Sequence, residues 1–285
     1  MLDITKTTIH IGLEKPFRAL HMSDNHIALA DERETMRKRE LAKNRTEAFS
    51  RNGNTALSFL EEMVAYAKKE GMPILHTGDL YDFVSYKNLE FARDLLNDID
   101  HIYAVGNHEY SLYLGEATED LPYKMQSYPL VQKYFRNNLF FDSRIINGVN
   151  FIALDDGYYN FYPEQLELLK AEAEKGLPMV LLMHNPLYTP EFFRFSMEVH
   201  AQKKCAFLTG VPEELMKDYS EYRYTQQKAT QTTFEMMDYI ANQPLIRAIL
   251  AGHLHANYEI PMPSGITQYV SGYGPKGIVR EITFT

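Results

Sequence analysis

The sequence has little cysteine, no tryptophan and no long apolar run. Its single cysteine, Cys205, has no second cysteine with which to form a disulfide in the same chain. The strongest continuous apolar run, residues 179–183, is far shorter than the roughly 20 residues that a membrane-spanning helix needs. Residues 1–10 contain no apolar stretch of the length found in signal peptides. We therefore expect a cytoplasmic protein that contains no internal disulfide and does not cross a membrane.

An excess of positive charge is also missing. With 38 acidic and 29 basic residues, the formal net charge at pH 7 is -9. Extended nucleic acids and anionic membranes bind proteins that offer a broad basic surface. We therefore expect neither of them as a partner, and the sequence does not indicate any protein partner. A small phosphorylated substrate is compatible with the charge, because one local site can be positive on an acidic protein.

Short apolar runs alternate with segments of helical periodicity along most of the chain. The apolar runs cover residues 17–22, 73–76, 101–105, 151–154, 178–183 and 245–251, and the helical segments cover 54–70, 87–97, 163–175 and 230–242. This alternation predicts an α/β fold with a buried, mostly parallel sheet. Short strand-like pieces at 258–260, 267–270 and 278–284 predict antiparallel hairpins.

Side chains that can bind metal ions follow five of the apolar runs. The five clusters are Ser23-Asp24-Asn25-His26, Gly78-Asp79-Leu80-Tyr81-Asp82, Gly106-Asn107-His108-Glu109, His184-Asn185-Pro186 and Gly252-His253-Leu254-His255. Each alone is compatible with an ordinary turn or a helix cap. Because the carboxyl ends of parallel strands share one edge of a sheet, their recurrence favours one common site. Imidazole, carboxylate and amide ligands suit Mn, Fe or Zn.

The order of these motifs resembles that of the calcineurin-like metallophosphoesterase superfamily over residues 17–285. The resemblance implies a sandwich of two packed β-sheets flanked by helices, with two divalent metal ions, of which Mn is expected and Fe or Zn are alternatives. The residues that match the metal ligands are Asp24, His26 and His255 for the first metal, Asn107, His184 and His253 for the second, and Asp79 for both.

The resemblance also implies metal-dependent hydrolysis of a phosphoester, with a hydroxide between the two metals as the nucleophile. His108 matches a catalytic histidine that is not a metal ligand, and Asp82 matches the carboxylate that orients and charges it. A helix N-cap is an alternative role for Asp82 that is compatible with the first.

Two departures from the family pattern bear on the substrate. Phe83 and Val105 stand where the serine/threonine protein phosphatases carry phosphate-binding arginines, and Asp82 stands where the purple acid phosphatases carry a tyrosine ligand. The chain is thus most similar to the bacterial-type small phosphoesterases. A diester has one fewer charged oxygen than a monoester and therefore needs fewer charged donors. Because the two phosphate-binding arginines are absent, we expect small phosphodiesters or nucleotides as substrates. The alternatives are a phosphomonoesterase and a non-catalytic metal-binding scaffold.

We expect a single domain over residues 1–285, with insertions near residues 27–53 and 188–232. The first insertion is rich in basic residues, and Arg37, Lys38 or Arg45 could reach a substrate from it. The alternative is that these residues form a helix face exposed to solvent. Residues 188–224 are rich in aromatic side chains. These could stack on a nucleotide base or form a core of their own.

Overall fold

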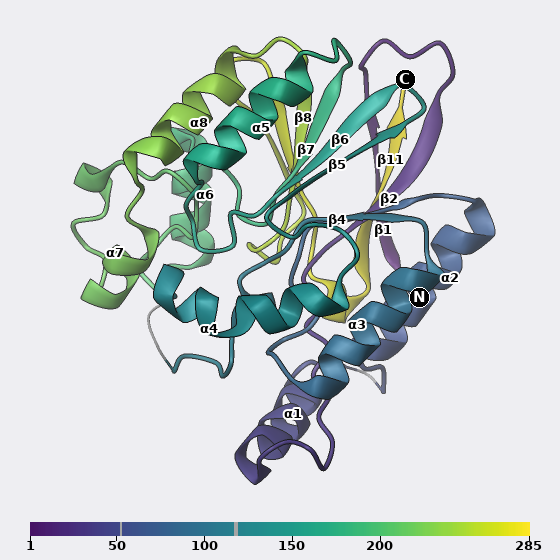
Figure 1. Cartoon of the computed structure of the whole chain (residues 1–285), viewed down its shortest axis with the longest axis vertical. Coiled ribbons are helices and arrows are strands. Elements are labelled where there is room, and N and C mark those ends of the chain that lie inside the picture. The colour runs from purple at the N-terminus through teal and green to yellow at the C-terminus, as the bar shows by residue number, and fades with distance from the viewer. Residues whose placement is uncertain (52, 117–118) are drawn as a thin grey trace.

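The computed structural model describes residues 1–51, 53–116 and 119–285. Figure 1 shows two β-sheets in the middle of the molecule, with helices on both sides. The first sheet has the strand order β1-β11-β2-β3-β4, and the second has the order β5-β6-β7-β8-β10-β9. The strands are β1 (Asp3–Ile9), β2 (Phe17–Met22), β3 (Ile74–His76), β4 (His101–Tyr103), β5 (Phe141–Ile146), β6 (Val149–Leu154), β7 (Met179–Leu182), β8 (Ile246–Ala251), β9 (Tyr258–Pro261), β10 (Thr267–Val270) and β11 (Ile278–Phe284).

The two sheets pack face to face through apolar side chains that each contributes. Leu75 and Ile102 of the first sheet belong to the same buried cluster as Phe151 and Val180 of the second. Within each sheet, β2, β3 and β4 are parallel, as are β6, β7 and β8. This confirms the predicted α/β fold of two packed sheets, and it places the carboxyl ends of the parallel strands of each sheet along one edge of that sheet.

Helices cover both outer faces. They are α1 (Met36–Ala48), α2 (Ala56–Glu70), α3 (Tyr86–Asp98), α4 (Leu121–Val131), α5 (Pro163–Ala173), α6 (Pro190–Val199), α7 (Glu221–Gln227) and α8 (Gln231–Asn242). Helices α2 and α3 share a core with β2 and β3, whereas α5 and α8 share one with β7 and β8 (Figure 1). Helix α2 begins with a capping box at Thr55 and ends at Gly71, which adopts the left-handed conformation that favours glycine. None of the described helices is long and apolar enough to cross a membrane.

The C-terminal strands differ from the predicted set of antiparallel hairpins. Only β9 and β10 form one, and β10 then pairs in parallel with β8. Strand β11 enters the other sheet, where it lies parallel to β1 and antiparallel to β2. Five of its seven residues are buried on both faces of the sheet, so an interior position satisfies it better than a hairpin at an edge.

Each predicted insertion contains helices next to the carboxyl edge of the sheets. The range 27–53 contains α1, although residue 52 lies outside the described residues, and the range 188–232 contains α6 and α7. In Figure 1, α1 lies at the lower end of the molecule and α7 at its left.

Candidate metal centre

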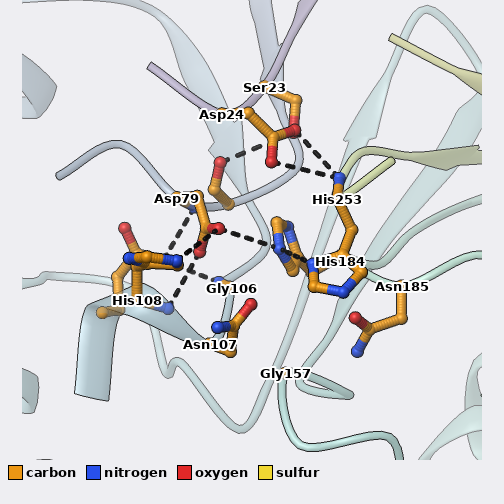
Figure 2. Close-up of polar contacts among 12 residues, drawn as sticks. Ser23, Asp24, Asp79, Gly106, Asn107, His108, Gly157, His184, Asn185 and His253 are labelled. Carbon is orange, nitrogen blue, oxygen red and sulfur yellow. Dashed lines mark hydrogen bonds and ion pairs between the residues drawn. The ribbon is translucent and has the colours of Figure 1, made fainter. Parts of the chain in front are cut away.

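The five predicted motifs meet at the carboxyl edge of the sheets. They follow β2, β3, β4, β7 and β8, and Figure 2 shows side chains from all five turned toward one another. Asp79 Oδ2 lies 3.1 Å from His184 Nε2, and His184 Nε2 lies 3.0 Å from His253 Nδ1. The backbone amide of His253 donates to Asp24 Oδ2 over 2.9 Å. Residues as far apart as 24 and 253 in the sequence therefore form one cluster.

Two groups of donors correspond to the two predicted ligand sets. The first joins Asp24, His26 and His255, and the second joins Asp79, His184 and His253; within each group the donor atoms lie within 4.8 Å of one another. A third group, formed by His26, Asp82 and His108, also satisfies this criterion. It shares His26 with the first group: Nδ1 of His26 faces Asp82, and Nε2 faces His255.

Asn107 lies beside the second group. Its side-chain Nδ2 donates to Glu119 Oε1 over 3.4 Å, whereas its buried Oδ1 has no hydrogen-bond partner in the part of the chain that the structure describes. A buried amide oxygen without a partner is costly unless something else satisfies it. Glu119 thus turns Asn107 so that its oxygen remains available as a ligand.

The backbone at the candidate ligands is strained. Nine residues other than glycine have a positive φ in the described chain, and five of them are candidate ligands: Asp24, His26, Asp79, His253 and His255, with φ between 49° and 67°. This conformation is unfavourable for residues with a Cβ and persists at sites where function requires it. The strain directs side chains from three tight loops toward a common point.

The donor set fits divalent metal ions. Ring nitrogens face each other at 3.0 Å in two places, between His26 and His255 and between His184 and His253. Burial lowers the pKa of His184, but the charge and hydrogen bond of Asp79 outweigh burial and raise the pKa to about 10. A site that draws a proton onto a buried histidine attracts positive charge, and a bound metal ion would replace that proton.

Glu109 joins two of the loops, a role that sequence reasoning did not assign to it. Its fully buried carboxylate accepts hydrogen bonds from the backbone amides of Asp79 and Leu80, each over 2.8 Å, and of Gly106 over 2.7 Å. Burial and the charge of Asp79 raise the pKa of Glu109 to about 7. Residue 106 must be glycine, because a Cβ there would collide with the carboxylate of Asp79.

We expect Glu109→Ala to lower the free energy of unfolding of the metal-free protein by about 3 kcal/mol, because three buried amides would lose their acceptor. Urea unfolding followed by circular dichroism measures the change. The matched control is Glu61→Ala, which removes an exposed carboxylate from α2. Equal free energies of unfolding for the two variants would contradict this role of Glu109.

Asp82 and His108 lie together, as the resemblance implied. His108 Nδ1 is 2.8 Å from the backbone oxygen of Asp82 and 3.3 Å from its Oδ1. This contact requires the proton on Nδ1 and leaves Nε2 toward the cavity. Burial lowers the pKa of His108, but the charge of Asp79 and the hydrogen bond and charge of Asp82 outweigh burial and raise the pKa well above its usual value.

Asp82 also contacts residues that the sequence did not connect to it. Its Oδ1 lies 3.0 Å from His26 Nδ1, and Arg45 Nε donates to its Oδ2 over 2.6 Å. Burial opposes ionisation, but the hydrogen bonds from His108, His26 and Arg45 hold the pKa of Asp82 well below its usual range. The carboxylate therefore fixes a candidate ligand and the candidate catalytic histidine at once.

Of the three cations proposed from the basic segment, only Arg45 lines the cavity at the metal centre. Arg37 pairs instead with Glu116, and Lys38 Nζ donates to the backbone oxygen of Val84 over 2.8 Å. The sequence could not distinguish them, because α1 has almost no apolar face to set its rotation.

The aromatic residues of 188–224 divide between the two roles that the sequence left open. Phe192 and Tyr219 are buried in a cluster with Val270, Tyr222 lines the cavity, and Phe207 belongs to the cluster and also lines the cavity. The cavity has a volume of about 450 Å³. It is large enough for a small organic ligand.

Two further residues support the site without a clear sequence signal. Asp156, which follows β6, accepts hydrogen bonds from the backbone amide of His184 over 2.8 Å and from Thr209 Oγ1 over 3.1 Å. The Tyr159 hydroxyl lies 2.7 Å from His253 Nε2, so it fixes the ring whose Nδ1 faces His184. Both residues follow β6 in a turn whose Asp-Gly sequence is also typical of surface loops.

Comparisons with known proteins place the chain in a family. The family model described as calcineurin-like phosphoesterase matches residues 17–257. No curated protein matches the sequence.

Several solved structures are similar to the chain at low sequence identity. A dimetal phosphatase from Danio rerio is 12% identical, with 93% of this chain and 91% of that chain covered and a TM-score of 0.48. The phosphopantetheinyl hydrolase from Mycobacterium tuberculosis is 12% identical, with 95% and 91% covered and a TM-score of 0.43. A 5'-nucleotidase from Candida albicans is 14% identical, with 90% of this chain and 46% of that chain covered and a TM-score of 0.41.

Proposed function

The chain belongs to the calcineurin-like phosphoesterase family and is a phosphoester hydrolase, and from this premise we propose that the converging motifs form its dinuclear metal centre. The observation that carries the proposal is the meeting of imidazole nitrogens, carboxylates and the unpartnered oxygen of Asn107 at one edge of the sheets. The proposed ligands are Asp24, His26 and His255 for one metal, Asn107, His184 and His253 for the other, and Asp79 for both. We propose Mn as the metal, with Fe or Zn as alternatives.

The protein groups around the metals would position the substrate and handle the leaving-group proton. Two divalent ions held by these residues would neutralise charge on the phosphoryl oxygens and would supply a hydroxide nucleophile, without a phosphoenzyme. His108 holds a proton at Nε2 and gives it to the departing oxygen. Asp82 keeps this ring charged and oriented, and Arg45 in turn holds Asp82.

We propose small phosphodiesters or nucleotides as the substrate class. Phe83 and Val105 are fully buried, so neither position offers a donor to a phosphoryl oxygen. The guanidinium of Arg45 already binds Asp82. Because there are few fixed donors at the reacting phosphate, the binding of a singly charged diester is weakened less than that of a doubly charged monoester. A phosphomonoesterase is the second candidate, since Lys203 and Arg223 line the same cavity and could supply charge.

We expect removal of metal by a chelator to lower phosphoesterase activity at least about 100-fold, and addition of Mn to restore it, because the metals supply several kcal/mol of charge stabilisation. The substrates are bis-p-nitrophenyl phosphate and p-nitrophenyl phosphate, compared by kcat/KM. Unchanged activity in the stripped protein would contradict the metal mechanism. A monoester preference of roughly 100-fold, about 2.7 kcal/mol, would overturn the diester assignment and leave that mechanism intact.

A further inference from the structure

The cavity at the metal centre contains a second group of side chains that hydrolysis itself does not require. Asp79, Asn107 and His108 of the metal centre line it. Other lining residues come from the chain between β7 and β8: His200, Lys203, Phe207, Tyr222, Arg223 and Gln226. One cavity therefore joins the reacting centre to side chains of the inserted segment.

Arg223 is held in place with free donors. Its guanidinium carbon lies 4.8 Å from the ring centre of Phe207 and 4.9 Å from that of Tyr222, and its Nη1 donates to Gln226 Oε1 over 2.6 Å. It forms no ion pair with any carboxylate of the described residues. The contacts with Phe207, Tyr222 and Gln226 fix the planar guanidinium group of Arg223 but leave N–H donors that can bind a carboxylate or a phosphate.

Lys203 is a second cation that lines the cavity. Its side chain is exposed, and its ammonium has neither an ion pair nor a hydrogen bond with the residues that the structure describes. The carboxylates that line the cavity are those of Asp79 and Glu119. Asp79 lies at the metal centre, and Glu119 accepts hydrogen bonds from Asn107 and Gln226. Neither of them forms an ion pair with Lys203 or Arg223.

A neighbouring polar atom also lacks a partner. His200 Nε2 is buried and has no hydrogen-bond partner among the described residues, and its ring lies against Phe207 with 4.9 Å between the ring centres. A group that entered the cavity would thus meet two cations, the side chain of His200 and two aromatic rings. That surface is suited to an anion attached to an organic skeleton.

From these contacts we infer that the substrate carries a second anionic group, a carboxylate or a phosphate, which Lys203 and Arg223 bind while the reacting phosphoester lies at the metal centre. The inference rests on the proposed function, because the location of the reacting group comes from it. Lys203 and Arg223 are thus specificity-determining residues. Charge-assisted hydrogen bonds of this kind correspond to roughly tenfold to hundredfold in affinity.

Binding of phosphonates tests the inference without turnover. Isothermal titration of the Mn-loaded protein would compare methyl-, phenyl- and biphenylphosphonate with the same compounds bearing a terminal carboxylate or a second phosphonate. At one spacing or more, we expect the added anion to lower Kd about tenfold to hundredfold. The carboxylate and phosphonate series show which anion the site prefers. In Lys203→Ala/Arg223→Ala, this gain should fall to less than about threefold.

The control variant is Arg194→Ala/Lys204→Ala, which removes the same charges from exposed positions of the same segment that do not line the cavity. It should keep the gain. The single variant Lys203→Ala, at an exposed residue, should lose part of it. A gain at no spacing, or the same gain in Lys203→Ala/Arg223→Ala, would overturn the inference. A gain in a protein that hydrolyses no phosphoester would support the anion site and overturn the proposed function instead.

Discussion

Asp79→Asn is expected to reduce the metal content from two ions per chain to one or none, and to lower kcat by about 10³-fold to 10⁵-fold. The carboxylate of Asp79 lies between the two candidate ligand groups, with Oδ2 3.1 Å from His184 Nε2 and 3.9 Å from His26 Nε2. The amide has nearly the same shape but lacks the charge, and one of its two terminal atoms would be an NH₂ group. Loss of a metal removes several kcal/mol of transition-state stabilisation.

Elemental analysis after reconstitution with Mn, followed by steady-state kinetics, measures both effects. The matched control is Asp238→Asn, which makes the same change at an exposed position on α8. It should retain two ions and full activity. Two bound ions and a kcat within tenfold of the unmodified protein in Asp79→Asn would show that this carboxylate does not bridge the metals.

His108→Asn should have a different signature: a fall in kcat of about 10²-fold to 10⁴-fold with two ions still bound. This is the range for removal of a positioned general acid. The backbone amide of His108, which donates to Asp79 Oδ1 over 2.9 Å, is unaffected by the substitution. The loss should be larger for a phenyl ester than for a p-nitrophenyl ester, because the more basic leaving oxygen needs the proton more.

The two esters compared in parallel, with metal content measured on the same samples, separate this role from ligation. His10→Asn is the control, at an exposed histidine whose ring contacts Thr285. Equal losses for both esters would contradict proton donation by His108. An emptied metal position would instead place His108 among the ligands.

The sequence was most informative where a chemical requirement coincided with a strand end. Asp24, Asp79 and His184 each follow an apolar run, and parallel strands bring such positions to one edge whatever the order of the strands. The order of the motifs also predicted which ligands share a metal ion. The alternation of apolar runs and helical segments alone does not predict this. The fold class was predictable for the same reason, since each sheet is built around parallel strands with apolar sequences.

Features that depend on tertiary packing were not predictable from the sequence. Strand β1 was not expected, because its sequence Asp3–Ile9 contains only two apolar residues, Ile4 and Ile9, and lies at a sheet edge. Glu109 accepts hydrogen bonds from three backbone amides. Those of Asp79 and Leu80 lie about 30 residues earlier in the chain, whereas that of Gly106 lies in the same loop as Glu109. Likewise, only the packing of α1 shows that Arg45, rather than Arg37, faces Asp82.

The central claim, two metal ions bound where the five motifs converge, is tested most directly by anomalous diffraction from crystals of the Mn-loaded protein. We predict two anomalous peaks beside the carboxylate of Asp79, one next to Asp24, His26 and His255 and the other next to Asn107, His184 and His253. A single peak, or a peak between His26, Asp82 and His108 in place of these, would contradict the assignment.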